Sequence, residues 1–248
     1  MNISMWVRGV LVTADKNAKI YYKKPPVIIF GLLFPLFMFI SFYLGRNIDL
    51  AAFFPGFLAM TLFFTASSVG PLITPWEKQA GTYERLLSYP VTVSTIIVGD
   101  ALASLIFGCA LSTVVLVCGL AFLNAAVVNA ALAVVAMLLG SACFAALGVL
   151  LASTSSRTPS NVMLLSSLVR FPLIFVSGIF VPLQQLAGAV LAVSYISPLT
   201  YLVDLFHAGM NGNPVLPVWL DILALMLFTG AFLLAANALQ RRGLAKGA

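Results

Sequence analysis

The sequence is poor in side chains that perform chemistry. Of its 248 residues, 8% are charged, three are cysteine and one is histidine. It holds no GxxxxGKS/T phosphate loop, which excludes nucleotide binding and hydrolysis by that route. A lone histidine excludes an HExxH or other multi-histidine metal site. We therefore expect no catalytic centre, no metal and no cofactor in this chain.

The cysteines and one acid–base pair are the remaining candidates for chemistry. Cys109, Cys118 and Cys143 lie in apolar runs at spacings that match neither a CxxC pair nor a zinc site, so we expect buried small side chains. Asp204 precedes His207 by three residues and could orient its imidazole, as a lipid-modifying membrane enzyme would require. Because no GxSxG nucleophile elbow accompanies the pair, we favour a simple polar contact.

Apolar residues dominate the sequence. They make up 62% of the chain, the mean hydropathy is +1.09, and apolar runs of about twenty residues recur. The net charge of +6 does not indicate a nucleic-acid partner, because the basic residues lie at the ends of apolar runs and form no patch. The sequence predicts an all-α polytopic membrane protein with six transmembrane helices. The expected spans are 27–44, 50–73, 93–123, 127–152, 161–181 and 218–239.

Two further segments are expected not to span the membrane. Residues 1–24 are basic and amphipathic, which predicts a helix on the membrane surface, and no cleavable signal peptide is expected. Residues 182–217 are moderately apolar, but prolines and glycines divide them into pieces of about ten to twelve residues, too short to span. Broken re-entrant helices before the last span are therefore predicted.

The longest polar segment between spans, residues 74–90, is predicted to be a single helix. Thr74 and Glu77 have the spacing of a capping box, Pro75 suits the first helical position, and Pro90 ends the helix. One side is apolar (Trp76, Ala80, Tyr83, Leu87), and the others carry charge (Glu77, Lys78, Glu84, Arg85). Such a helix either connects two spans along the membrane surface or docks a soluble partner.

The distribution of lysine and arginine sets the expected orientation. With six spans, eleven of these residues fall on the side that holds both termini and the 74–90 helix. The opposite side carries Arg46. By the positive-inside rule, both termini and the 74–90 helix are expected to be cytoplasmic and residues 182–217 to face outside.

Two ionisable residues lie within predicted spans. Asp100 and Arg170 are at similar expected depths, about 10 to 14 Å from the cytoplasmic ends of their helices. They could form a structural ion pair, or Arg170 could extend toward the membrane surface. They could also act as a gate or a substrate contact on a translocation path.

The order of these parts resembles the permease subunits of ABC type-2 exporters, in particular the daunorubicin-resistance and nodulation-factor-export branch. The similarity covers nearly the whole chain. The stretches that carry it are EKQAGTYERLLSYPVTVSTIIVGD (77–100), LLASTSSRTPSNV (150–162), FPLIFVSGIFVPLQQL (171–186) and ISPLTYLVDLFHAG (196–209).

The resemblance implies the membrane subunit of an ATP-driven exporter in a bacterial or archaeal inner membrane. It implies a permease dimer, here a homodimer in preference to a heterodimer, and two separate ATP-binding-cassette subunits that hold ATP and Mg. The expected cargo is amphipathic, drug-like or lipid-linked. The residues implied at the ATPase contact are Trp76, Glu77, Gly81, Thr82, Tyr83, Glu84, Arg85 and Leu86.

The resemblance also assigns residues to the outer side and the path. Pro198 and Tyr201, with Leu199, would lie in the outer helices that cap the path. Arg170 departs from the family pattern, which has an apolar residue there, so the path is not expected to be purely hydrophobic. The alternative is a secondary transporter or channel that needs no ATPase. That class uses inverted repeats with paired broken helices and charge relays, whereas this sequence shows one broken region.

Overall fold

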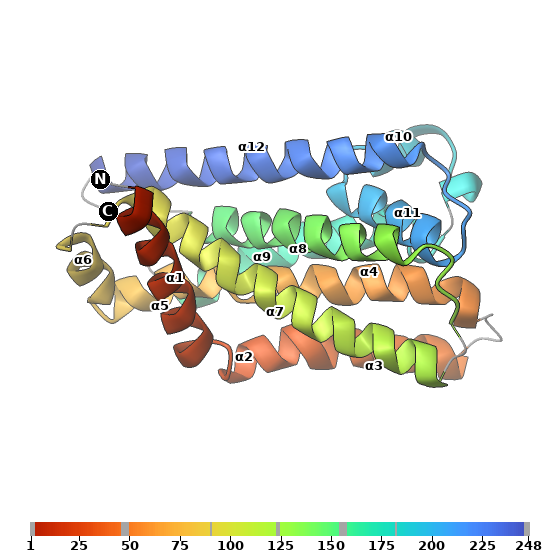
Figure 1. Ribbon diagram of the computed structural model, residues 1–248, viewed down its shortest axis with the longest axis horizontal. Coiled ribbons are helices and arrows are strands. Elements are labelled where there is room, and N and C mark those ends of the chain that lie inside the picture. Colours follow the sequence, from red (N-terminus) through yellow and green to blue (C-terminus); the bar gives the residue numbers. More distant parts are fainter. Residues whose placement is uncertain are drawn as a thin grey trace.

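The computed structural model is a bundle of helices. Figure 1 shows the long helices side by side along one axis. At one end lie α1 (Ile3–Ile20), which crosses the bundle, and α6 (Thr82–Leu87). At the other lie α10 (Gly188–Ser194) and α11 (Pro198–Met210). We call these the α6 end and the α11 end. The structure describes residues 3–45, 50–89, 91–122, 125–153, 158–181 and 183–245, and no strand occurs within these ranges.

The long helices have the length and composition of membrane spans. They are α4 (Leu50–Ser68) with α5 (Gly70–Gln79), α7 (Val93–Phe122), α8 (Ala130–Ala152), α9 (Pro159–Val176) and α12 (Val218–Ala245). In the described residues, five stretches are long and apolar enough to cross a membrane, or six if α10 and α11 count as one bent span. The prediction of an all-α polytopic membrane protein is confirmed.

The first predicted span contains a local change of helix type. Helix α2 (Pro25–Ile28) continues into a π-helix, η1 (Ile29–Leu33), and then into α3 (Phe34–Gly45). The N–H of Phe34 donates to the carbonyl of Ile29, five residues back. Pro35 follows directly and has no N–H to continue the α-helical pattern, which accounts for a widened turn at this position. The apolar helix described here, Ile29–Ser41, is shorter than the five long spans.

The predicted capping box at Thr74 is wrong. Helix α5 begins at Gly70, with Pro71 in its first turn, so Thr74 lies inside the helix and its buried hydroxyl has no partner among the described residues. Pro71 is as well suited to a helix start as Pro75, and it comes four residues earlier. The single helix predicted over 74–90 is also wrong. It is divided at Gly81, whose φ of 64° is left-handed, and α6 begins at Thr82.

The region predicted to hold broken helices is broken as expected. A 3₁₀ turn, η2 (Leu183–Gln185), precedes α10, and α10 and α11 are bent by 83° relative to each other. The hydroxyl of Thr200 donates to the carbonyl of Ser194 at 2.7 Å, and that of Tyr201 donates to the carbonyl of Tyr195 at 2.7 Å. These two bonds tie the start of α11 to the end of α10.

The centre of the bundle is formed by α4, α5 and α8. Residues 54–75 are all buried, and the rings of Phe63 and Phe144 meet edge to face with centroids 4.8 Å apart. A Cβ on Gly70 would lie 2.9 Å from the backbone carbon of Gly148, so the backbones of α5 and α8 touch there. Helices α4 and α5, which we call the α4–α5 rod, are therefore enclosed over residues 54–75 by the other helices of the chain.

Several expectations fall on residues outside the described ranges. They are the turn 45–49 with Arg46 (of which only Gly45 is described), the helix stop at Pro90, Arg157, Pro182 and Lys246.

Candidate functional site

Helix α1 lies across the beginning of α7 at the α6 end (Figure 1). A Cβ on Gly99 of α7 would come within 2.6 Å of the Cβ of Thr13 and 3.1 Å of the carbonyl of Val10. Glycine at this position therefore lets the two helix backbones approach closely. The close crossing places the polar side chains of α1 against α5 and α7.

An ion pair and an aromatic stack connect α1 to α5. Glu77 is 1% exposed and forms an ion pair with Lys16 of α1. The Tyr21 hydroxyl donates to the same carboxylate at 3.4 Å. Burial, and next the charge of Glu77, raise the pKa of Tyr21, which keeps this donor protonated. The Tyr21 ring stacks on Trp76 at 5.6 Å, and Lys24 lies 4.0 Å from the Trp76 ring centroid.

A second polar contact connects α1 to α7. The Asn17 side-chain amide donates to the carboxylate of Asp100 at 2.6 Å, and both residues are fully buried. The Tyr22 hydroxyl donates to that of Ser104 at 3.3 Å, one turn further along α7. Asn17 of α1 and Tyr22 just beyond it thus bond to the first half of α7.

Arg170 contacts the break between α4 and α5. Its Nη2 donates to the carbonyl oxygen of Ser67. In a continuous helix that oxygen would accept from the N–H of residue 71, but Pro71 has none. The arginine therefore satisfies a carbonyl that the proline leaves free.

Asp100 and Arg170 do not form the ion pair considered from the sequence. Asp100 points at α1 and Arg170 at the α4–α5 break. Equal depth along two spans says nothing about the direction in which each helix presents its side chain, so the ion pair that was one of the possibilities does not form. The structure instead brings each residue to a partner on a different helix.

The predicted ATPase-contact residues divide into a buried and an exposed group. Glu77 and Tyr83 are buried, and Trp76 is half-buried against Tyr21 and Lys24. The Tyr83 hydroxyl donates to Gln240 of α12 at 3.5 Å, and burial is the largest cause of the rise of its pKa to about 12. Leu86 is half-buried, whereas an exposed group remains on the surface of the turn and α6: Gly81, Thr82, Glu84 and Arg85.

The sequence grouped Glu77 with Glu84 and Arg85 on polar faces of one helix, and for Glu77 this is wrong. The helix is interrupted at Gly81, so the angular order of side chains is not continued across the break. Lys16 and Tyr21 then enclose the Glu77 carboxylate. The sequence reasoning treated Lys16 as a topology signal, and it missed Asn17 because a single polar residue on an amphipathic helix indicates no partner.

At the α11 end, the predicted capping residues are packed. Pro198 begins α11 and is buried, and the Tyr201 hydroxyl is bonded to the carbonyl of Tyr195. Asp204 accepts from the backbone N–H groups of Val215 at 2.8 Å and Leu216 at 2.7 Å. Its carboxylate thus fixes the connection between α11 and α12.

Asp204 and His207, the acid–base pair considered from the sequence, bond to different partners in the structure. The ring nitrogen Nδ1 of His207 lies 3.4 Å from the side-chain amide of Asn211. The Asp204 carboxylate instead accepts from backbone N–H groups beyond the end of α11. The described residues contain no group of three or more His, Cys, Asp or Glu side chains that could hold a metal. What they do contain is a polar junction of α1, α5 and α7 next to the exposed α6.

The comparisons with known proteins agree with this arrangement. The model of the family described as ABC-2 type transporter matches residues 8–211, from α1 through α11. Nodulation protein J of Rhizobium meliloti (strain 1021) is 27% identical over 228 residues, which cover 89% of this chain and 84% of that protein. The family match thus takes in α6, the helices from α2 to α9 and the bent α10–α11 pair, and it ends before α12. The chain therefore belongs to the ABC-2 type transporter family, as a membrane subunit.

Proposed function

We propose that this chain is the permease subunit of an ATP-driven exporter, and that a separate ABC ATPase docks on α6. The observation that carries the proposal is the exposed group on α6, Thr82, Glu84 and Arg85, directly beside a buried junction of three helices. An exposed acid and base on a short helix offer a soluble partner charge-assisted contacts. The sequence contains no GxxxxGKS/T phosphate loop, and the proposal therefore assigns ATP hydrolysis to a separate partner.

The α6 end is proposed to be cytoplasmic. Arg8, Lys16, Lys19 and Lys24 of the first segment lie at that end, as do Arg241 and Arg242 of α12. This is the side on which lysine and arginine accumulate in membrane proteins. The membrane is then the inner membrane of a bacterium or archaeon, and the α11 end faces outward.

Coupling follows from how α6 is attached. Only Ala80 and Gly81 separate α6 from α5, and α5 continues the buried rod of α4. The Lys16–Glu77 ion pair and the Asn17–Asp100 bond fix α1 to α5 and α7 at the same level. A displacement of α6 by an ATPase therefore moves the central rod and α1 together, and it favours whichever state of the permease makes better contacts.

Two copies of this chain are proposed to form the path. Helix α9 exposes an apolar stripe at helical spacing, while α4 is enclosed within its own subunit. A second copy packed on this stripe would build a path wall from α9, with the bent α10–α11 pair at its α11 end. The stripe consists of Leu164, Leu168, Phe171 and Phe175.

The test is co-purification of the tagged chain with a candidate ABC ATPase from the same organism, together with ATP hydrolysis by the complex. The variant is Glu84→Ala with Arg85→Ala, and the matched control is Asp15→Ala with Lys19→Ala, an exposed ion pair on α1. We expect the α6 variant to lose at least about tenfold in association, and the control to bind as wild type does. If the α6 variant retains the ATPase and its coupled hydrolysis, α6 is not the docking site. If no ATPase binds and the purified chain alone moves solute with an ion gradient, the secondary-transporter alternative holds.

A further inference from the structure

Arg170 is a buried cation without a counter-charge. It is 5% exposed, and its Nε has no hydrogen-bond partner among the described residues. The ion pairs found in that part of the chain join Lys16 to Glu77 and Lys19 to Asp15, so neither involves Arg170. A guanidinium has five N–H donors, and a neutral carbonyl, that of Ser67, compensates its charge poorly.

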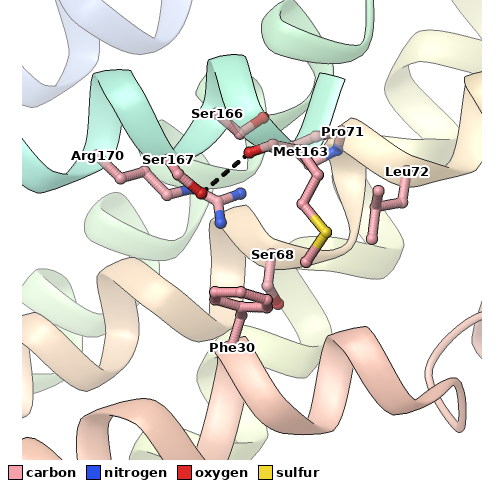
Figure 2. Close-up of a pocket in the computed structure, with 8 residues that line it drawn as sticks. All are labelled: Phe30, Ser68, Pro71, Leu72, Met163, Ser166, Ser167 and Arg170. Atoms are coloured by element: carbon pink, nitrogen blue, oxygen red, sulfur yellow. Dashed lines mark hydrogen bonds between the residues drawn. The ribbon is translucent and has the colours of Figure 1, made fainter. Parts of the chain in front are cut away.

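A small hollow lies in front of this guanidinium. Figure 2 shows the Arg170 side chain directed from α9 toward Phe30 and Ser68 on the facing helices. The enclosed part of the hollow has room for about one water molecule, and the space of about 260 Å³ around it includes the open region outside its mouth. It is lined by Phe30, Ser68, Pro71, Leu72, Met163, Ser166, Ser167 and Arg170.

The arginine is the donor that this hollow offers to a ligand. The hydroxyls of Ser166 and Ser167 donate to carbonyls of their own helix, at 2.7 Å to Val162 and 3.0 Å to Met163 (dashed for Ser167 in Figure 2). The hydroxyl of Ser68 donates in the same way within α4. Hydroxyls that donate elsewhere can only accept from a ligand, so the donors on offer are those of Arg170, whose positive charge and unpartnered Nε favour an anion.

The surroundings of the hollow favour a ligand that arrives from the bilayer. Its walls come from η1, the α4–α5 break and α9. Helix η1 exposes the apolar side chains of Ile29 and Leu32. Arg170 is the twelfth residue of α9, about 16 Å from the start of that helix. An acyl chain could thus lie along the exposed apolar side chains while its headgroup reaches Arg170.

We propose that Arg170 and this hollow bind the phosphate headgroup of a membrane amphiphile. Phosphate matches the planar fork of a guanidinium and can accept from Nε and Nη2 together. The binding itself does not depend on the proposed transport function; calling the amphiphile a cargo, or a model of one, does rest on it. A lipid-linked phosphate would in that case be the class of substrate, recognised within the membrane at the level of Arg170.

The test measures binding of phosphatidic acid to the purified full chain in detergent by native mass spectrometry. Diacylglycerol supplies the same chains without phosphate, and inorganic phosphate supplies the headgroup without chains. We expect Arg170→Gln to weaken phosphatidic acid binding by at least about tenfold, with Arg170→Lys intermediate and diacylglycerol binding unchanged in all variants. The matched control is Arg241→Gln, an exposed arginine of α12 whose Nε donates to Asn237.

The outcomes separate binding at this site from general attraction. If Arg170→Gln binds as wild type does, or if Arg241→Gln loses as much, the proposal is overturned. Displacement of phosphatidic acid by an equal concentration of inorganic phosphate would overturn the amphiphile as ligand. Should Arg170→Gln fail to fold, Ser167→Leu fills the hollow with Arg170 in place, and it must show the same loss. No ATPase is involved, so a failure here leaves the docking test on α6 untouched.

Discussion

At the scale of single residues, the α6 end depends on charged groups that find partners across helices. Glu77 is buried and would be strongly destabilising without Lys16, because an isolated buried carboxylate loses its hydration with no compensation. Arg170 fills a comparable need at Ser67, where Pro71 removes the normal donor. In both cases a buried acceptor on one helix, a carboxylate or a backbone carbonyl, is paired with a basic side chain of another helix.

Removal of Lys16 tests the first of these contacts. We expect Lys16→Met to lower the free energy of unfolding by about 1–3 kcal/mol, because it leaves the Glu77 carboxylate buried and unpaired. Lys16→Met combined with Glu77→Gln should recover part of that loss, since the double variant has no buried charge to compensate. Thermal unfolding in detergent measures both.

The matched control is Lys19→Met, which removes a cation from an exposed pair with Asp15 and should change stability little. An equal loss in the Lys16 and Lys19 variants, or an additive loss in the double variant, would mean that the Lys16–Glu77 contact contributes nothing specific.

At the scale of elements, the turn between α5 and α6 sets the direction of the proposed docking helix. Gly81 has a φ of 64°, and a Cβ added there would meet nothing within 4 Å. Packing therefore leaves space for a side chain, and backbone conformation alone favours glycine. The angle between α5 and α6 therefore depends on the left-handed conformation of Gly81.

Replacement of Gly81 tests that role. Gly81→Ala should cost about 1 kcal/mol in the left-handed conformation, while Gly81→Asn should cost less because asparagine adopts it more readily. We expect ATP hydrolysis coupled to the permease to fall in the order glycine, asparagine, alanine. Gly230→Ala in the middle of α12, where a Cβ also meets nothing, is the control and should not impair hydrolysis. If ATP hydrolysis is the same with glycine, asparagine or alanine at position 81, the turn does not orient α6.

At the scale of the whole molecule, the sequence sufficed for the architecture because apolar length is a direct physical requirement of a membrane span. It also located the broken α10–α11 region, since proline and glycine there interrupt helices. It failed where the outcome depends on which way a helix faces: Asp100 and Arg170 were matched by depth, and Glu77 was placed by a periodicity that ends at Gly81. Pro71 in the sequence is enough to infer that the carbonyl of Ser67 lacks its helical donor, but the sequence does not indicate that Arg170 replaces that donor. Such partners depend on helix rotation, which no local pattern specifies.

The orientation of the whole bundle is the remaining property that charge distribution predicts. Single cysteines placed at exposed positions of the two ends test it, in a background in which Cys109, Cys118 and Cys143 are alanine. Lys19→Cys lies in α1 at the α6 end, and Asn213→Cys lies between α11 and α12. In intact cells, a membrane-impermeant maleimide should label Asn213→Cys and leave Lys19→Cys unlabelled. After the membrane is permeabilised, it should label Lys19→Cys as well. The physical reason is that the lysines and arginines of α1 and of the end of α12 resist transfer across the membrane. Labelling of Lys19→Cys in intact cells, with Asn213→Cys protected, would reverse the orientation and place α6 out of reach of any cytosolic ATPase.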